Sequence, residues 1–394
     1  MAGDCIRQIP RRGFVLSLAA TILMMAAASA PSLFYPQIAE RLGLIPVATT
    51  LVFAVYTFTL LAALLYLGPL SDYIGRRPVV TAGSLALALS LAMFWFAGGL
   101  ATLLVARALQ GLAAGLLIPA LSAMMIDFEP PSHPNIAALW NTIGPMIGLG
   151  TGALGAALLL DLTPEPTAAV FGLLVLAFLT VAATVWSTPE LVPKTRIRRG
   201  DLRPRFMVPL HLRRMFTAGV PAIIAGWATN GLFLALGAGL VGSELGGSTH
   251  THAGIVIFAL AISGVTASSV LQRRSARTIS LYATSALAFG TAVSIGALAL
   301  GSYPAYVASV AIVGSGFGTA FLGVLRTLMP HTASSERAAV MAVIYTVAYL
   351  AFGVPTIVAG LLVPVLTLSG TMTILGAIII ALSLAATVLR LRIP

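Results

Sequence analysis

The segment 68–78 places turn-forming and charged residues between two apolar runs and reads Gly-Pro-Leu-Ser-Asp-Tyr-Ile-Gly-Arg-Arg-Pro. Asp72 at a helix end could accept hydrogen bonds from the N-terminus of a neighbouring helix, and Gly75 would permit a sharp turn. The paired arginines would face carboxylates on the same side, of which Asp127 is the obvious candidate. The pattern predicts an ion-pair cluster around a turn, with Gly68 allowing close helix approach. Its members are Gly68, Asp72, Gly75, Arg76, Arg77 and Asp127.

Arg107 falls inside an apolar run. An arginine within a bilayer costs several kcal/mol unless it faces a polar cavity or a partner. Gln110, Gly111, Ala114 and Gly115 follow at helical spacings of three and four, which puts them on the face of Arg107. We therefore expect the guanidinium to point into a central cavity beside small residues and to act in substrate binding or proton coupling. The alternative is a structural role, with hydrogen bonds to backbone carbonyls.

A few polar and aromatic residues project from the other apolar runs, as a substrate site near the bilayer midplane would require. Tyr345 and Tyr349 are four residues apart and share a helix face. A mainly aromatic pocket with one permanent charge suits amphipathic, lipophilic or weakly acidic aromatic molecules better than sugars. For each aromatic residue, packing against lipid or a neighbouring helix is the alternative. The other candidates are Tyr35, Tyr56, Asn141, Trp227 and Asn230.

Glycine recurs every four residues at Gly144, Gly148 and Gly152. This spacing makes a flat ridge on a helix, against which a second helix can pack closely. Pro145 in the same run removes one backbone hydrogen bond and can kink the helix.

The acidic residues lie at the ends of the apolar runs, so a proton carrier must be sought there. Such a carrier needs a carboxylate whose environment changes between two access states. Glu40 and Asp161 are the candidates, and the alternative is that Arg107 or the substrate itself mediates coupling. We interpret His250 and His252 as ordinary polar loop residues. We expect no metal site.

These residues need a scaffold of membrane-spanning helices. Hydrophobic residues make up 59% of the 394 residues and charged residues only 8%, against about 25% charged residues in a soluble domain. Apolar stretches of roughly 20 residues, each long enough to cross a bilayer, recur from end to end. The predicted helices cover residues 14–38, 47–70, 79–98, 101–126, 135–160, 167–187, 214–240, 253–271, 279–300, 304–327, 337–364 and 368–389.

The basic residues predict the orientation, because Lys and Arg accumulate in short cytoplasmic loops. With the N-terminus inside, all 22 basic residues fall in inner segments except Arg41, which is outside, and Arg107, which is embedded. Both termini are therefore expected in the cytoplasm. The net charge of +11 is spread over these short segments and does not form the basic face that a nucleic-acid partner requires. We divide the chain into a bundle at 1–188, a basic linker at 189–213 and a bundle at 214–394.

Three of these segments resemble motifs of the major facilitator superfamily. The segment 68–78 is similar to the family's signature between helices two and three, with Tyr73 where a basic residue is usual. The segment 107–111 is similar to the family's second motif, and 144–152 resembles the glycine-proline signature of its exporters. In the second half, the turn 272–277 partly resembles the first motif: it keeps the basic residues, and Ser269 lies near the place of the aspartate.

The resemblance implies an all-α membrane protein with twelve helices in two six-helix bundles related by a pseudo-twofold axis. It also implies that the segment 68–78 is a latch that holds the cytoplasmic side shut. We expect a monomeric multidrug-type antiporter of the inner (plasma) membrane, which exports a small amphipathic or lipophilic molecule in exchange for protons by alternating access. It would contact membrane lipids and require no cofactor.

Two alternatives stay open. The first is proton-coupled uptake of a small organic anion, with Arg107 as its counter-ion. The second is a membrane-embedded enzyme or sensor, which the sequence disfavours. It shows no nucleophile elbow, and its single lysine, Lys194, follows no phosphate-binding loop.

Overall fold

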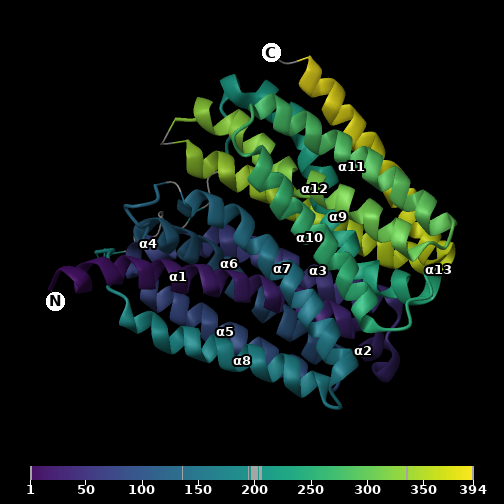
Figure 1. Ribbon diagram of the computed structural model, residues 1–394, viewed down its shortest axis with the longest axis horizontal. Coiled ribbons are helices and arrows are strands. Elements are labelled where there is room, and N and C mark those ends of the chain that lie inside the picture. The colour runs from purple at the N-terminus through teal and green to yellow at the C-terminus, as the bar shows by residue number, and fades with distance from the viewer. Residues whose placement is uncertain are drawn as a thin grey trace.

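The computed structural model describes residues 2–134, 136–193, 195–196, 203, 206–333 and 336–392, with the backbone alone for 2–11, and every regular element in these ranges is helical. The first eight α-helices are α1 (Ala2–Ser29), α2 (Tyr35–Leu42), α3 (Pro46–Leu67), α4 (Leu70–Ile74), α5 (Arg76–Trp95), α6 (Leu100–Asp127), α7 (Ile136–Leu162) and α8 (Pro166–Thr184). The others are α9 (Arg213–Glu244), α10 (His250–Leu271), α11 (Ala276–Ala299), α12 (Tyr303–Leu328) and α13 (Arg337–Leu391). Figure 1 shows them as one bundle of long helices.

The first predicted span is longer and less regular than expected. The sequence predicts one helix at 14–38, whereas α1 is followed by a 3-10 turn at Ala30–Phe34 and then by α2. Pro31 is the second residue of the 3-10 turn, and Pro36 is the second residue of α2. Proline has no backbone N–H to continue the preceding helix but is tolerated in the first turn of a new one.

The last helix, α13, is two membrane spans in one continuous run. Its 55 residues would be about 80 Å long, whereas the hydrocarbon core of a bilayer is about 30 Å thick. Thr367 interrupts the helical backbone with φ of 64°. The sequence predicts a break between residues 364 and 368, and the structure confirms it. Eleven apolar helical segments of the described chain are long enough to span a membrane, and this break raises the number to the predicted twelve.

The two halves of the chain lie side by side. Figure 1 shows α1–α8, in purple to teal, below α9–α13, in green to yellow. Two helix pairs join the halves, because α3 packs against α13 and α7 packs against α10. The domain boundaries at 189–213 stay a prediction, since Lys194 and residues 197–202, 204 and 205 lie outside the described residues.

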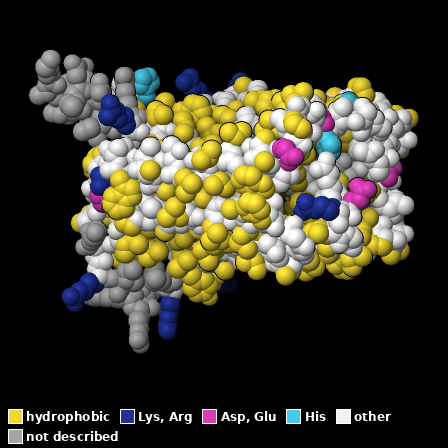
Figure 2. All heavy atoms as spheres, turned by 90° about the horizontal axis from the view of Figure 1, so that it is seen from below, with side chains coloured by type: hydrophobic (Ala, Val, Ile, Leu, Met, Phe, Trp, Pro, Cys, Tyr) yellow, Lys and Arg dark blue, Asp and Glu magenta, His cyan; other side chains and the backbone are white. Residues whose placement is uncertain are grey.

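Apart from Arg107, the charged side chains of the described residues lie at the two ends of the bundle. Figure 2 shows arginine side chains mainly at the left end, acidic side chains mostly at the right end, histidine side chains at both ends, and apolar side chains between them. We call these the Asp72 end and the Asp161 end. The separation agrees with membrane-spanning helices, because charged groups avoid hydrocarbon.

The arginine distribution predicts that the Asp72 end faces the cytoplasm, and cysteine labelling tests this orientation. In a chain carrying Cys5→Ser, a cysteine at Ser248 should react with an impermeant maleimide in intact cells. A cysteine at Thr195 should react only after permeabilisation. Both positions are exposed. The opposite pattern would reverse the predicted orientation.

Candidate functional site

An ion-pair cluster forms at the Asp72 end. The Arg76 guanidinium donates from Nε to Asp127 Oδ2 at 3.1 Å, from Nη1 to Ser71 Oγ at 2.8 Å, and also to Asp72. All these residues belong to α4, α5 and α6 in the first half of the chain. In this conformation the predicted latch therefore ties three helices of one half together and does not bridge the halves.

Glu190 completes this cluster, and sequence reasoning missed it. Its carboxylate accepts hydrogen bonds from the backbone N–H groups of Arg76 at 3.0 Å and Arg77 at 2.9 Å. These N–H groups begin α5 and have no partner within the helix, so an anion there is favourable. The signal was available: Glu190 follows the sixth predicted span at the same membrane side as the turn. We call Asp72, Arg76, Asp127 and Glu190 the Asp72 cluster.

Three predictions about this turn are wrong in detail. The carboxylate that meets a helix N-terminus is Glu190, whereas Asp72 binds a side chain. Among the described residues, Arg77 makes no ion pair, and its Nε has no hydrogen-bond partner. Gly68 is not required for close helix approach, because a Cβ there would make only an ordinary contact of 3.8 Å with Pro119 of α6, whereas its collision would be with the Leu64 carbonyl of its own helix. Gly75 is required, since φ is 100° and a Cβ would lie 2.7 Å from Glu190 Oε2.

The Asp161 end holds a second polar cluster, and this one joins the two halves. Asp161 at the end of α7 accepts hydrogen bonds from the backbone N–H groups of His250 at 3.0 Å and Thr251 at 2.8 Å. The Thr251 hydroxyl donates at 2.5 Å, and His250 Nδ1 lies 2.8 Å from Asp161 Oδ1. On its other side, His250 Nε2 lies 3.0 Å from Gln37 Nε2 of α2. We call Gln37, Asp161, His250 and Thr251 the Asp161 cluster.

His250 makes side-chain contacts with two other helices. The Asp161 carboxylate accepts from Nδ1–H, and Nε2 faces the side-chain amide of Gln37. The sequence interpretation of His250 as an ordinary loop residue is therefore incomplete, because His250 connects α10 to α2 and α7. The other predicted carrier, Glu40, is exposed near the end of α2.

Arg107 is completely buried among the helices of the first half. Its Nε donates to Tyr35 Oη at 2.5 Å, and its Nη1 donates to Gln110 Oε1 and to the Ala28 carbonyl, the latter at 3.5 Å. Gln110 in turn donates to the Ala27 carbonyl at 2.8 Å. Four rings surround the guanidinium, with centroids 5.2–5.9 Å from Cζ. These rings belong to Tyr35, Phe53, Tyr56 and Phe94, and we call the group the Arg107 cage.

The prediction that Arg107 points into a polar cavity is wrong for this conformation. Gly111 and Gly115 pack directly against α3, where a Cβ at Gly115 would lie 2.5 Å from the Ala63 Cβ. No carboxylate of the described residues pairs with Arg107, and its Nη2 has no hydrogen-bond partner. The positive charge is stabilised by oxygen acceptors and by cation–π contacts, and one donor is left free.

An aromatic cluster links the cage to the second half of the chain. Phe53 of the cage lies 5.2 Å from Phe352 of α13, measured between ring centroids. Trp227 of α9 lies 6.0 Å from Phe352 and 4.9 Å from Tyr349. Phe321 and Tyr345 extend the group. The structure thus brings together the predicted Trp227, Tyr345 and Tyr349, while Phe53, Phe321 and Phe352 were missed because a phenylalanine in an apolar run carries no distinguishing signal.

Two of the predicted polar residues differ in their surroundings. Asn230 is buried on the same helix as Trp227, and the Asn230 Oδ1 and Trp227 Nε1 atoms both lack hydrogen-bond partners. Asn141 instead donates to the Ser122 carbonyl at 3.4 Å, which ties α7 to α6 within the first half.

The glycine ridge of α7 packs against α1. The Cβ positions at Gly144, Gly148 and Gly152 face Leu18, Ile22 and Ala26, so two four-residue ladders run along each other. At Gly148 and Gly152 a Cβ would collide with the α1 backbone. Pro145 lies inside α7, which runs unbroken from Ile136 to Leu162. A different face of α7 meets the second half, where a Cβ at Gly150 would lie 2.8 Å from Ala261 Cβ.

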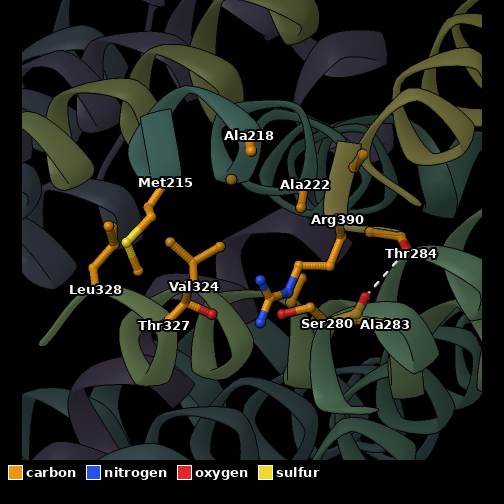
Figure 3. Close-up of a pocket in the computed structure, with 13 residues that line it drawn as sticks. Met215, Ala218, Ala222, Ser280, Ala283, Thr284, Val324, Thr327, Leu328 and Arg390 are labelled. Atoms are coloured by element: carbon orange, nitrogen blue, oxygen red, sulfur yellow. Dashed lines mark hydrogen bonds between the residues drawn. The ribbon is translucent and has the colours of Figure 1, made fainter. Parts of the chain in front are cut away.

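A cavity lies apart from all these residues, between α9, α11, α12 and α13. Figure 3 shows the Arg390 guanidinium pointing into it beside Ser280 and Thr327, with Met215 and Leu328 at the other end. None of the predicted substrate residues lines this cavity. Its position inside one half does not suit a site that both halves must enclose.

Comparison with known proteins agrees with this arrangement. A sequence model of the Major Facilitator Superfamily matches residues 16–356. The chain is 30% identical over 152 residues to puromycin resistance protein pur8 of Streptomyces alboniger, covering 37% of the chain and 30% of that protein. It is 31% identical over 150 residues to multidrug resistance protein MdtL of Shewanella oneidensis, covering 36% of the chain and 37% of that protein. These matches thus span only about a third of each relative.

Glu190→Ala should weaken the Asp72 cluster. The substitution removes both acceptors at the start of α5, and loss of a helix cap lowers the free energy of unfolding by about 0.5–2 kcal/mol. Thermal unfolding of the purified protein in detergent measures the effect. Glu40→Ala removes an exposed carboxylate and is the control. Equal melting temperatures for the two variants would contradict the assigned role of Glu190.

Asp161→Asn should loosen the contact between the halves at the Asp161 end. It removes the negative charge that holds the start of α10, and a loss of about 1.4 kcal/mol would raise the ratio of open to closed molecules tenfold. Spin labels at Thr163 and Ser248 report the separation by double electron–electron resonance. Longer distances should gain population in Asp161→Asn and not in the control Glu165→Gln. An unchanged distribution would show that the cluster does not hold the halves together.

Proposed function

The chain belongs to the major facilitator superfamily, and on this premise we propose that it exports small amphipathic or lipophilic molecules across the inner (plasma) membrane in exchange for protons. The family consists of transporters, and the chain is a multi-pass membrane protein. Resistance functions in the names of its relatives favour export of drug-like molecules. The transporter acts as a monomer in this proposal.

The aromatic cluster is the observation that carries the proposal. It lies where α3 of the first half meets α13 of the second, and such an interface is where family members that rock two halves bind their substrates. Trp227, Tyr349 and Phe352 offer flat apolar surfaces, and only a few polar atoms accompany them. This composition suits an amphipathic aromatic molecule, whereas a sugar requires many hydrogen-bonding side chains.

The two polar clusters support an alternating-access cycle. The Asp161 cluster bridges the halves, whereas the Asp72 cluster lies within one half. The contacts between the halves at Gly150, Gly254 and Gly360 also lie from the middle of the helices to the Asp161 end, and Gly264 meets Met146 slightly beyond the middle on the other side. The contacts therefore close the Asp161 end, which is the outer end in the proposed orientation.

Asp161 is the proton-responsive group in this proposal. Its carboxylate accepts four hydrogen bonds from α10 while the halves touch, and opening of the Asp161 end would replace them with water. This change of environment is what a coupling carboxylate requires. Glu40, which is exposed already, would experience a smaller change.

Arg107 favours a second candidate, the uptake of a small organic anion. Its charge has no carboxylate partner among the described residues, and Nη2 is free to bind an anion. An anion could reach it only if the surrounding rings moved, since the guanidinium is fully buried. The two candidates differ in direction, so substrate accumulation in cells with and without the protein, under an imposed proton gradient, separates them.

Trp227→Ala should slow export about thirtyfold, because a central aromatic residue of a binding site contributes roughly 2 kcal/mol. The measurement is efflux of ethidium and of puromycin from cells or reconstituted vesicles with a proton gradient. Phe96→Ala, which removes an aromatic residue that is 74% exposed, is the control. Equal rates for both variants would exclude the aromatic cluster as the substrate site.

A further inference from the structure

The turn between α10 and α11 corresponds to the turn of the Asp72 cluster, because each joins the second and third spans of its half. In the first half, the arginine side chain is held by Asp72 and Asp127, and the start of α5 is held by Glu190. In the second half the turn carries Arg273 and Arg274, and Ser269 lies near the place of the aspartate. The basic residues are retained and the carboxylates are absent from these positions.

The fourth span of each half shows the same difference. In the first half α6 ends at Asp127, which binds Arg76. In the second half α12 ends at Leu328, and its last turn carries Arg326. A cation therefore takes the place of an anion, and its Nη1 donates to the Arg274 carbonyl at 3.3 Å.

Arg274, Arg326 and Arg337 line one open groove of about 570 Å³ at the Asp72 end. Among the described residues, no carboxylate forms an ion pair with any of these arginines. Glu336 is adjacent to Arg337 in sequence, but its carboxylate accepts the backbone N–H of Ala333 at 3.3 Å. Three like charges around one groove repel each other, so an anion placed among them is stabilised by all three.

The rest of the groove identifies the kind of anion. Leu325, Met329 and Pro330 provide an apolar wall beside the three guanidinium groups. The groove also lies where α12 ends and α13 begins, which is the level of lipid headgroups for helices that span the bilayer. Basic pockets between helices at this level suit a phosphate headgroup, and the apolar wall suits the glycerol and first acyl carbons.

We propose that Arg274, Arg326 and Arg337 form a binding site for the phosphate headgroup of an anionic phospholipid. The lipid phosphate supplies the negative charge that Asp72 and Asp127 supply in the first half. The site does not depend on the identity of the transported molecule or on the direction of transport.

Native mass spectrometry of the purified full-length protein tests this site, with phosphatidylglycerol and phosphatidylcholine as probes. The variant Arg274→Gln/Arg326→Gln/Arg337→Gln should bind phosphatidylglycerol roughly a hundredfold more weakly than the wild type, at roughly fivefold for each arginine. Binding of phosphatidylcholine should not change. If the triple variant is not monodisperse, Arg326→Gln alone should show the fivefold loss.

The control variant is Arg273→Gln/Arg277→Gln/Arg390→Gln, which removes the same charge from the same end of the same half without altering the groove. It should retain most of the phosphatidylglycerol affinity. An equal loss in both triple variants would show that the attraction comes from overall charge, and would overturn the site. Displacement of the lipid by inorganic phosphate at equal concentration would also overturn it, because the groove would then select phosphate without its lipid.

Discussion

The high free energy of a charge in hydrocarbon is the constraint on which this structure depends. Helices satisfy their own backbone hydrogen bonds, so the chain can cross the membrane repeatedly, provided that its charged side chains lie at the two ends. Figure 2 shows this separation. Arg107 is the exception, and the fold compensates for it with Tyr35, Gln110, a backbone carbonyl and four aromatic rings.

The polar clusters at the two ends make different connections, one within a half and one between the halves. The Asp72 cluster joins α4, α5 and α6 to Glu190 behind α8, and it can move as part of a rigid half. The Asp161 cluster joins α7 and α2 to α10, and it must break if the halves separate there. The polar contacts that would be lost on separation of the halves therefore lie at the Asp161 end. That asymmetry is why a carboxylate outside the membrane centre can serve the proposed coupling.

Small residues decide which helix contacts are close. Lipid provides no hydrophobic driving force between helices, so association relies on backbone approach at glycine and alanine. Two faces of α7 illustrate this, because Gly144, Gly148 and Gly152 meet α1 of the same half while Gly150 meets α10 of the other. The first contact interlocks two ladders. The second places Gly150 against Ala261 and Phe258.

The sequence by itself determined the spans, their number, the family and the positions of charge, because hydropathy and arginine placement are local properties that the bilayer enforces. Even the break near Thr367 followed from the length limit of a span. Only the tertiary structure decided which partner each charge meets. Glu190 lies 114 residues from Arg76, His250 lies 89 residues from Asp161, and the rings around Arg107 come from three separate helices. Such pairings depend on how helices pack, and helix packing is a property of the whole bundle.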